Sequence, residues 1–413
     1  MVAIRWAKAH RLRRVLIVAP FSCFPSWAEE LDLENCSYQI LIGTRKQRLA
    51  KLAEEYRFSI LNKEGFLSIP EISTIPWDGI ILDESVFIKN PKAKVTKFYT
   101  TKMAYIPYRM ILTGLPNPES DLEFYSQFKF LLGSFCGIHN YWAFRSRYFI
   151  PSGFGGYEWR AKKGVPEMIA TEVNRNAFIL RRKDAGRTIP SATEIRSVDF
   201  PPSIRKIYKR LERDFILSSE FTEDKAVIHG IAQYVHLRKM CSGIVEESIV
   251  WDGKIKEVNE LLAGELRGEQ CVIWFSYRRA QAEMLHKIKC ESVASIDGST
   301  PIFERMEIQA KFKIGQIQIL LAQVAVAETG INLSAADTAI YFTEPPGLNG
   351  YRQSKDRILD LRKTTTLLYL PLIVPNSVEE DLHVALRAKS YRSEISLSRA
   401  LRERLLERIG GLQ

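Results

Sequence analysis

Short apolar runs alternate with amphipathic segments along most of this chain, a pattern that predicts strands separated by helices. In the first third, strands are expected at 14–20, 38–41, 58–61, 80–82 and 109–112. The opening segment has helical spacing, with Ile4 and Ala7 on one side of the helix. Alternation of this kind is typical of an α/β fold in which helices cover both faces of a parallel sheet.

The same alternation divides the chain into two sheet-forming lobes. The first is expected over 1–190, with a helical, aromatic insertion at about 121–179 that contains a Gly-rich connector at 151–159. A helical linker is expected over 191–250 and the second lobe over 251–390. The last residues, 391–413, have leucines at helical spacing and predict a packing helix.

Composition narrows the class of protein. The 413 residues are 46% hydrophobic and 26% charged, as in ordinary globular proteins, and contain no long uninterrupted apolar run or cleavage-site pattern. We therefore expect no membrane partner and a cytoplasmic location, associated with the nucleoid if the source is bacterial or viral. Six scattered cysteines without a C-x-x-C pair argue against a zinc site or a disulfide framework. The net charge of +11 favours a polyanionic partner such as nucleic acid.

The segment WDGIILDESVFIKNP at 77–91 has the strongest chemical pattern. Its apolar run ends in Asp83 and Glu84, which places two carboxylates at the carboxyl edge of a sheet, where α/β proteins bind ligands. In phosphoryl transfer one carboxylate can hold a Mg²⁺-bound water while the other orients the attacking water. The alternative is a strand end with a solvated acidic pair.

Other segments decide between these alternatives. MILTGLP follows at 110–116, ILLAQVAVAETGINLSAADTAIYF lies at 319–342 and QSKDR at 353–357. In order and spacing, together with 77–91, they resemble the helicase-like motor of the Swi/Snf-related branch of superfamily-two helicases and translocases. The resemblance implies two RecA-like lobes whose motifs face one cleft, ATP and Mg²⁺ as cofactors, and double-stranded DNA as partner.

The resemblance also assigns roles to residues of the nucleotide site. Asp83 would hold Mg²⁺ through water, Glu84 would orient the attacking water and Arg357 would touch the γ-phosphate. The implied nucleotide contacts are Thr113, Gly330 and Gln353. Thr113 could bond to Glu84 and so report the nucleotide state, or it could only satisfy a backbone group at a strand end.

The implied nucleic-acid contacts are Ser22, Asn62, Ser276, Tyr277, Thr329 and Asn332. Each has an ordinary structural alternative. Ser22, or the nearby Ser26, could be a helix cap, and Asn62 a turn residue. Aromatic residues such as Tyr277 at a strand end more often belong to a core.

The chain departs from the family pattern at three positions. Leu115 replaces the second Thr of Thr-Gly-Thr-Pro, and Val86 replaces a His. Asp360 stands where the family has a second arginine, and would repel phosphate. If the helix that carries Arg357 continued, Arg362 would lie nearly 200° around it from position 360. It could then not take the place of the missing second arginine without local rearrangement.

No G-x-x-x-x-G-K-[ST] phosphate loop occurs in the sequence. In the family this loop precedes the segment with which the chain starts. The resemblance therefore implies a first lobe incomplete at its N-terminus, with a gap or an exposed strand edge in its sheet. It also implies weak ATP binding and a possible companion chain that carries the loop.

The expected function is that of an ATP-dependent DNA helicase or double-stranded-DNA translocase that needs the missing piece for hydrolysis. The alternative is a non-catalytic DNA-binding or scaffold protein derived from such a motor. A third possibility is a basic structural protein that does not bind nucleic acid.

Overall fold

The computed structural model describes most of the chain, in two compact units. These are unit 1, Met1–Arg181, and unit 2, Arg182–Gln413. The described residues are 1–114, 116–117, 120–152, 158–180, 189–217, 223–327, 331–360 and 362–387. The helix expected at 391–413 and the centre of the Gly-rich connector lie outside them.

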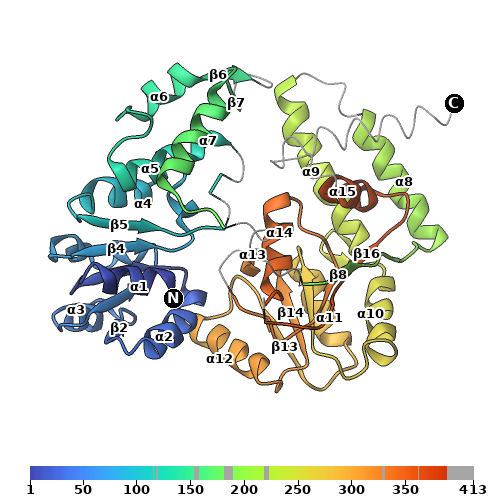
Figure 1. The fold of residues 1–413 in the computed structure, drawn as a ribbon. Coiled ribbons are helices and arrows are strands. Elements are labelled where there is room, and N and C mark those ends of the chain that lie inside the picture. The colour runs from blue at the N-terminus through green and yellow to red at the C-terminus, as the bar shows by residue number, and fades with distance from the viewer. Residues whose placement is uncertain are drawn as a thin grey trace. The chain divides into compact units, whose positions relative to one another are not determined.

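Unit 1 is built on a five-stranded sheet in which all strands are parallel (Figure 1). In spatial order they are β2 (Tyr38–Ile40), β3 (Phe58–Leu61), β1 (Val15–Val18), β4 (Gly79–Leu82) and β5 (Tyr108–Ile111). The expected strands and their parallel pairing are confirmed. Of the expected gap or exposed strand edge, the sheet has no gap, because the five strands pair without interruption, while its outer strand β5 is only partly buried.

Alternate side chains of β1 enter two different cores, as a period of two requires. Val15 and Ile17 pack with α1 (Val2–Ala9) and α2 (Phe24–Leu33), whereas Leu16 and Val18 pack on the other face. Ile4 and Ala7 of α1 are fully buried, which confirms the apolar stripe read from the sequence. Because both faces are covered, the strands consist almost entirely of apolar residues.

The insertion in unit 1 has an aromatic core of its own. It contains α5 (Phe124–Leu132), α6 (Tyr141–Tyr148) and α7 (Val165–Asn176). The Gly-rich connector is flanked by an antiparallel hairpin of β6 (Phe149–Ser152) and β7 (Glu158–Ala161), which the sequence pattern did not predict. Shorter helical turns of unit 1 are η1 (Phe21–Cys23), α3 (Arg45–Leu52), η2 (Gly65–Leu67), η3 (Pro70–Thr74), η4 (Ser85–Ile88), α4 (Lys94–Lys97), η5 (Phe98–Lys102) and η6 (Asp121–Glu123).

Unit 2 contains a second parallel sheet (Figure 1). In spatial order its strands are β13 (Val293–Ile296), β14 (Ile319–Gln323), β12 (Cys271–Phe275), β15 (Thr338–Tyr341), β16 (Leu367–Ile373) and β8 (Ser191–Thr193). A further strand, β9 (Arg196–Ser197), also pairs with β16. Residues 191–197 were expected to begin a helical linker. They instead extend this sheet, because the outer edge of β16 offers backbone hydrogen bonds to them.

The remaining elements of unit 2 are mostly helices, and no helix in the described part of the chain is both long and apolar enough to cross a bilayer. They are α8 (Pro202–Leu217), α9 (Glu223–Cys241), the hairpin β10 (Ile244–Val245) and β11 (Ser248–Ile249), α10 (Gly253–Ala263), α11 (Arg278–Lys287), α12 (Ile302–Lys313), α13 (Val324–Ala327), α14 (Leu348–Arg357) and α15 (Val378–Arg387).

The two sheets share one topology. In unit 1 the chain leaves β1 toward β2 and leaves the neighbouring strand β4 toward β5, in the opposite direction. In unit 2 it leaves β12 toward β13 and β15 toward β16 in the same manner. Adjacent parallel strands whose connections diverge create a crevice at their carboxyl ends, and such switch points bind ligands in open α/β sheets. Each unit therefore has one such point, between β1 and β4 or between β12 and β15.

A buried ion pair in unit 2 joins α10 to α15. Lys254, at the start of α10, donates to both carboxylate oxygens of Glu379 at 2.8 Å and to the carbonyl of Phe342 at 2.9 Å. The two charged side chains are 1% and 4% exposed. Burial raises the pKa of Glu379, while the Lys254 ammonium lowers it. Each charge depends on the other, because neither reaches water.

Replacing Lys254 with Ala should destabilise unit 2 by about 3–5 kcal/mol, since it leaves the Glu379 carboxylate buried without its cation. Urea denaturation of the full chain measures the loss. The control is Lys256→Ala on the same helix, whose side chain is 69% exposed and whose loss should cost less than about 0.5 kcal/mol. The double change Lys254→Met with Glu379→Leu should recover most of the stability. A Lys254→Ala protein as stable as the Lys256→Ala protein would contradict this account.

Candidate functional site

The carboxylate of Asp83 is held in place at the switch point of unit 1. Its backbone N–H continues the β1–β4 ladder by donating to Val18 at 2.8 Å. One carboxylate oxygen accepts from the indole Nε1 of Trp27 at 2.8 Å, and the other from the Glu84 backbone N–H at 3.0 Å. Trp27 lies on α2, 56 residues away in sequence, and nothing in the sequence pattern marked it. The two bonds fix the direction of this acid before any ligand arrives.

Glu84 has left-handed backbone geometry, with φ 49° and ψ 51°. A residue with a side chain adopts this conformation at a cost, and such residues concentrate at functional sites. The next residue explains how the kink is maintained. Ser85 donates its N–H to Leu112 at 2.9 Å, and its hydroxyl donates to Gln127 at 2.8 Å. The segment after β5 and helix α5 thus anchor the residue that follows the kink.

Thr113 lies just after β5. This strand is hydrogen-bonded to β4, which ends just before Asp83 and Glu84. Leu112 donates to Leu82 at 2.8 Å and accepts from Ser85, which places the backbone at 112–113 beside that at 83–85. This backbone arrangement is what a contact between Thr113 and Glu84 requires. The contact itself stays a prediction.

Ser22 and Asn62 have different surroundings at the same edge of the sheet. Ser22 lies in η1, and its hydroxyl oxygen is buried without a hydrogen-bond partner among the described residues. It is not a helix cap, because α2 begins after Cys23 with no side-chain cap. Asn62 is 7% exposed and its carbonyl closes a turn with Gly65 at 2.8 Å. The backbone of Asn62 agrees with the turn interpretation, while its side-chain oxygen, like the Ser22 hydroxyl, is buried without a hydrogen-bond partner among the described residues.

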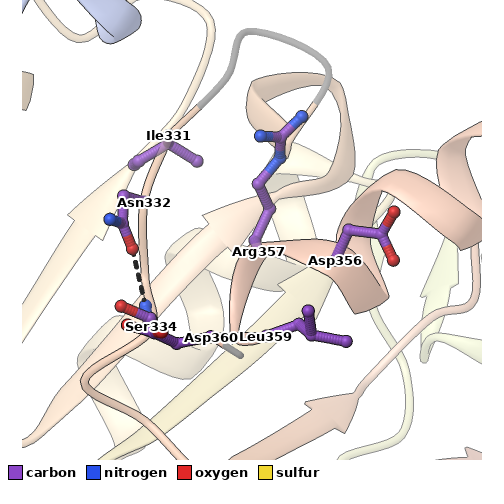
Figure 2. A pocket seen from close by; sticks show the side chains of 7 residues that line it. All are labelled: Ile331, Asn332, Ser334, Asp356, Arg357, Leu359 and Asp360. Atoms are coloured by element: carbon purple, nitrogen blue, oxygen red, sulfur yellow. Dashed lines mark hydrogen bonds between the residues drawn. The ribbon is translucent and has the colours of Figure 1, made fainter. Parts of the chain in front are cut away.

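A pocket of about 420 Å³ lies in unit 2 at the end of α14 (Figure 2). It is lined by Ile331, Asn332, Ser334, Asp356, Arg357, Leu359 and Asp360. The N–H of Leu333 donates to the carbonyl of Arg357 at 2.9 Å, which joins the two segments that carry the expected contacts. The side-chain oxygen of Asn332 accepts from Ser334 at 3.0 Å, so this exposed residue is held in a defined turn.

The remaining expected contacts of unit 2, Gln353 and Gly330 to nucleotide and Thr329 to DNA, divide between described and undescribed residues. Gln353 lies one turn before Arg357 on α14, and its side-chain oxygen is buried without a partner among the described residues. Thr329 and Gly330 lie outside the described residues, as does Leu115 in unit 1. The structure therefore brings together Asn332 and Arg357 from segments that are 25 residues apart.

The Asp360 carboxylate, which lines this pocket, is paired with Arg362. Helix α14 ends at Arg357, so the helical geometry assumed for Arg362 is wrong. Arg362 instead donates to both carboxylate oxygens of Asp360, with Nη2 at 2.8 Å from Oδ2 and Nε at 3.1 Å from Oδ1. These hydrogen bonds lower the pKa of Asp360 to about 2. The carboxylate that was expected to repel phosphate is thus balanced by a guanidinium.

Ser276 and Tyr277 lie at the switch point of unit 2, but they contact the interior. The Ser276 hydroxyl donates to the carbonyl of Glu344 at 3.2 Å, and Arg238 donates to the same carbonyl at 2.5 Å. The Arg238 guanidinium also lies 5.8 Å from the Tyr277 ring centroid. His383 binds the Glu344 carboxylate at 2.9 Å. This crevice is filled by a polar network, and a DNA contact of Ser276 or Tyr277 stays a prediction.

The donor set at Asp83 suits Mg²⁺ held through water. Among the described residues no group of three or more His, Cys, Asp or Glu is placed to cage a metal. Magnesium commonly uses one or two carboxylates, with water and substrate phosphates completing its shell. The paired acids at the β4 end supply those oxygens, whereas a structural zinc site would need a closed set of ligands.

Two family models match this chain over most of its length. The SNF2-related domain matches residues 4–244 and the Helicase conserved C-terminal domain matches 253–361. The chain belongs to the SNF2-related family. This confirms the resemblance read from the motifs, and with it the expectation of two RecA-like parallel-sheet lobes.

Relatives of this SNF2-related chain are much longer proteins. It is 24% identical over 431 residues to the ATP-dependent helicase brm of Drosophila melanogaster, covering 92% of this chain and 26% of that protein. It is also 24% identical over 404 residues to the helicase/translocase YwqA of Bacillus subtilis, covering 91% of this chain and 42% of the relative. The chain thus spans about a quarter to two fifths of these relatives.

Among solved structures, the SWI2/SNF2 ATPase core of Sulfolobus solfataricus in complex with dsDNA is similar. It shares 22% identity with the SNF2-related chain, with a TM-score of 0.42, and the match covers 97% of this chain and 86% of that one.

The Asp360–Arg362 pair should give a small, pH-dependent stabilisation. The pKa of Asp360 is depressed from 3.8 to about 2, so the contribution is present above about pH 4 and is lost as the pH falls toward 2. Arg362 is 89% exposed, and solvent screening limits the gain to about 0.2–1 kcal/mol. Arg362→Gln should therefore lower the free energy of unfolding at pH 7 but much less near pH 2, in urea titrations. Arg267→Gln, an exposed control, should show no such pH dependence; equal behaviour of both variants would contradict the pairing.

Proposed function

We propose that this SNF2-related chain forms the greater part of a motor that couples ATP hydrolysis to movement along double-stranded DNA or to its opening. The observation that carries the proposal is the fixed acidic pair at the switch point of unit 1. Asp83 is oriented by Trp27, and Glu84 is projected by a left-handed kink, at the place where an open α/β sheet binds ligands. The family match and the net charge of +11 support ATP and DNA respectively.

Three residues carry the proposed chemistry. Asp83 holds Mg²⁺ through water, Glu84 orients the attacking water, and Arg357 stabilises negative charge on the γ-phosphate. Bound Mg²⁺ would neutralise charge on the phosphate oxygens. Thr113, Gln353 and the undescribed Gly330 complete the proposed nucleotide contacts.

The proposed DNA contacts differ in how well the geometry supports them. Ser22 has a buried hydroxyl without a partner among the described residues, and Asn332 presents an exposed amide in a fixed turn. The Asn62 side-chain oxygen is likewise buried without a partner among the described residues, and Ser276 and Tyr277 contact the interior, so Ser22, Asn62, Ser276 and Tyr277 would all need to rearrange to meet DNA. Thr329 adds a proposed contact outside the described residues.

We also propose that tight ATP binding requires a phosphate loop from outside these 413 residues, supplied by the same polypeptide or by a companion chain. The G-x-x-x-x-G-K-[ST] pattern of such a loop does not occur within the 413 residues. Its amides and lysine supply charge-assisted hydrogen bonds of roughly 1.5–3 kcal/mol each. Without three of them, ATP affinity would fall by about 5 kcal/mol or more, several thousand-fold.

Glu84→Gln should lower DNA-stimulated ATP hydrolysis by about 10²–10⁴-fold, because the amide cannot act as the base that orients the attacking water. Hydrolysis is measured on the chain with and without an added segment that carries a phosphate loop, and the wild type should be weak without it. The matched control is Glu55→Gln, an exposed acid of the same unit, which should keep wild-type turnover. Strong turnover by the 413 residues alone would refute the need for the added segment. Full activity of the Glu84→Gln protein would refute its assigned role.

Arg357→Ala should reduce the hydrolysis rate on the order of 10³-fold while DNA affinity stays within a few-fold, because this guanidinium acts on the transferring phosphoryl group. Arg352→Ala removes an exposed arginine from the same helix and serves as the control. Single-turnover hydrolysis and DNA binding are compared for both variants. A rate within tenfold of wild type for Arg357→Ala would exclude the proposed role.

One observation favours a second candidate, a non-catalytic DNA-binding scaffold. The position of the family's second arginine holds Asp360, and that carboxylate is engaged with Arg362 in a stable pair. A protein that binds duplex DNA in a salt-dependent manner, but shows no hydrolysis with any phosphate-loop segment, would match this scaffold and not the motor.

A further inference from the structure

Two tryptophans of unit 1 hold two cations against their rings. The Arg145 guanidinium lies 4.6 Å from the Trp142 ring centroid and 3.9 Å from that of Trp159. The Lys92 ammonium lies 5.0 Å from the same Trp142 ring. We name these four residues the cation–tryptophan cluster. Because both cations contact one ring, two like charges are kept close together at the surface.

The cluster joins parts of unit 1 that are far apart in sequence. Trp142 and Arg145 lie on α6 and Trp159 on β7, which belong to the insertion beside each other in Figure 1. Lys92 lies in the segment between η4 and α4, a few residues after the acidic pair. The cluster therefore connects the insertion to the segment that begins at Asp83 and Glu84.

The two segments that meet at this cluster are strongly basic. Residues 85–102 include five lysines and no acidic residue. Residues 124–164 include six Lys or Arg and one acidic residue, Glu158. Within the described part of the chain, no acidic side chain forms an ion pair with Lys92, Lys94 or Arg145. Lys89 of the first segment is paired with Glu123 at 2.8 Å, whereas the positive charge of Lys92, Lys94 and Arg145 has no ion-pair partner among the described residues.

We propose that the cation–tryptophan cluster, with the neighbouring Lys94, is a binding site for backbone phosphates of duplex DNA. The site is separate from the motif positions assigned above, and it rests on the proposed function in taking DNA as the partner. A polyanion supplies the missing counter-charge, and each neutralised phosphate releases condensed counterions. Ordering costs are low, because the rings already hold Lys92 and Arg145 in place.

The arrangement fits phosphates better than bases. Trp142 is 47% exposed, but two cations already lie within 5.0 Å of its ring centroid. A base could stack there only by displacing them, at a loss of about 0.5–1 kcal/mol for each exposed cation–π contact. The site should therefore bind duplexes without sequence preference and should not favour single strands.

The test measures the affinity of the full chain for a short duplex over a range of salt concentrations. In the variant Lys92→Gln with Lys94→Gln, the slope of log K against log salt should fall in magnitude by about 1.8, since each phosphate contact contributes about 0.9. The matched control, Arg13→Gln with Lys46→Gln, removes two exposed charges of unit 1 outside the basic segments and should leave the slope unchanged. The charge-conserving variant Lys92→Arg with Lys94→Arg should keep it. Thermal unfolding checks that all variants are folded.

The outcomes separate this site from the proposed function. If the wild type binds DNA and both glutamine doubles have its slope, the site is wrong while the proposed function stands. If the wild type shows no salt-dependent DNA binding, both are wrong. If the Lys92/Lys94 double keeps the DNA slope but alone loses binding to polyglutamate, the surface recognises acidic protein and the inference is overturned. A clear preference for single strands that the same double abolishes would also overturn it.

Discussion

Parallel strand pairing is the constraint on which the rest of this structure depends. Two parallel strands cannot be joined by a tight turn. Each connection must run back over one face of the sheet before the next strand begins, so the carboxyl ends of all strands lie along one edge. Where connections from adjacent strands diverge, no crossing segment covers that edge. In unit 1 this happens between β1 and β4, and in unit 2 between β12 and β15. The positions of the acidic pair and of the polar network in unit 2 both follow from this topology.

The two switch points contain different chemistry. In unit 1, a half-buried carboxylate is fixed by an indole and by the backbone, and the next residue projects from a strained turn. In unit 2, buried polar groups pair at the corresponding crevice, with Lys254 on Glu379 and His383 on Glu344, although His383 Nε2 and Arg238 Nε are buried without a hydrogen-bond partner among the described residues. A closed polar network is costly to open because its members lose their partners in a low-dielectric interior. One crevice is therefore suited to ligand chemistry and the other to holding helices on the sheet.

Some charged side chains of this protein are paired with an opposite charge and others are not. Only the unpaired ones are available to a charged partner. Asp360 is charged but balanced, because Arg362 donates to both of its oxygens. Lys92 and Arg145 are held on aromatic rings and form no ion pair with an acidic side chain in the described residues. The net charge of +11 alone suggests a polyanionic partner. The structure adds which cations are neutralised within the chain and which remain available to such a partner.

The sequence by itself determined most strands of the two parallel sheets, their parallel class, the position of Asp83 and Glu84 at a sheet edge, and the family, but not β6 to β9. Apolar periodicity is a local signal that indicates which residues of a strand or helix are buried. Motif order indicates in which order the functional segments follow one another along the chain. Tertiary structure alone decided the Trp27–Asp83 bond, the left-handed turn at Glu84 and the joining of residues 191–197 to the second sheet. It also ended α14 at Arg357, so that Arg362 meets Asp360. The Trp27–Asp83 bond and the pairing of 191–197 with β16 depend on which distant segments the fold brings together, and a pattern of polar and apolar positions contains no information about that pairing; the Asp360–Arg362 pair is local and depends on where the helix ends.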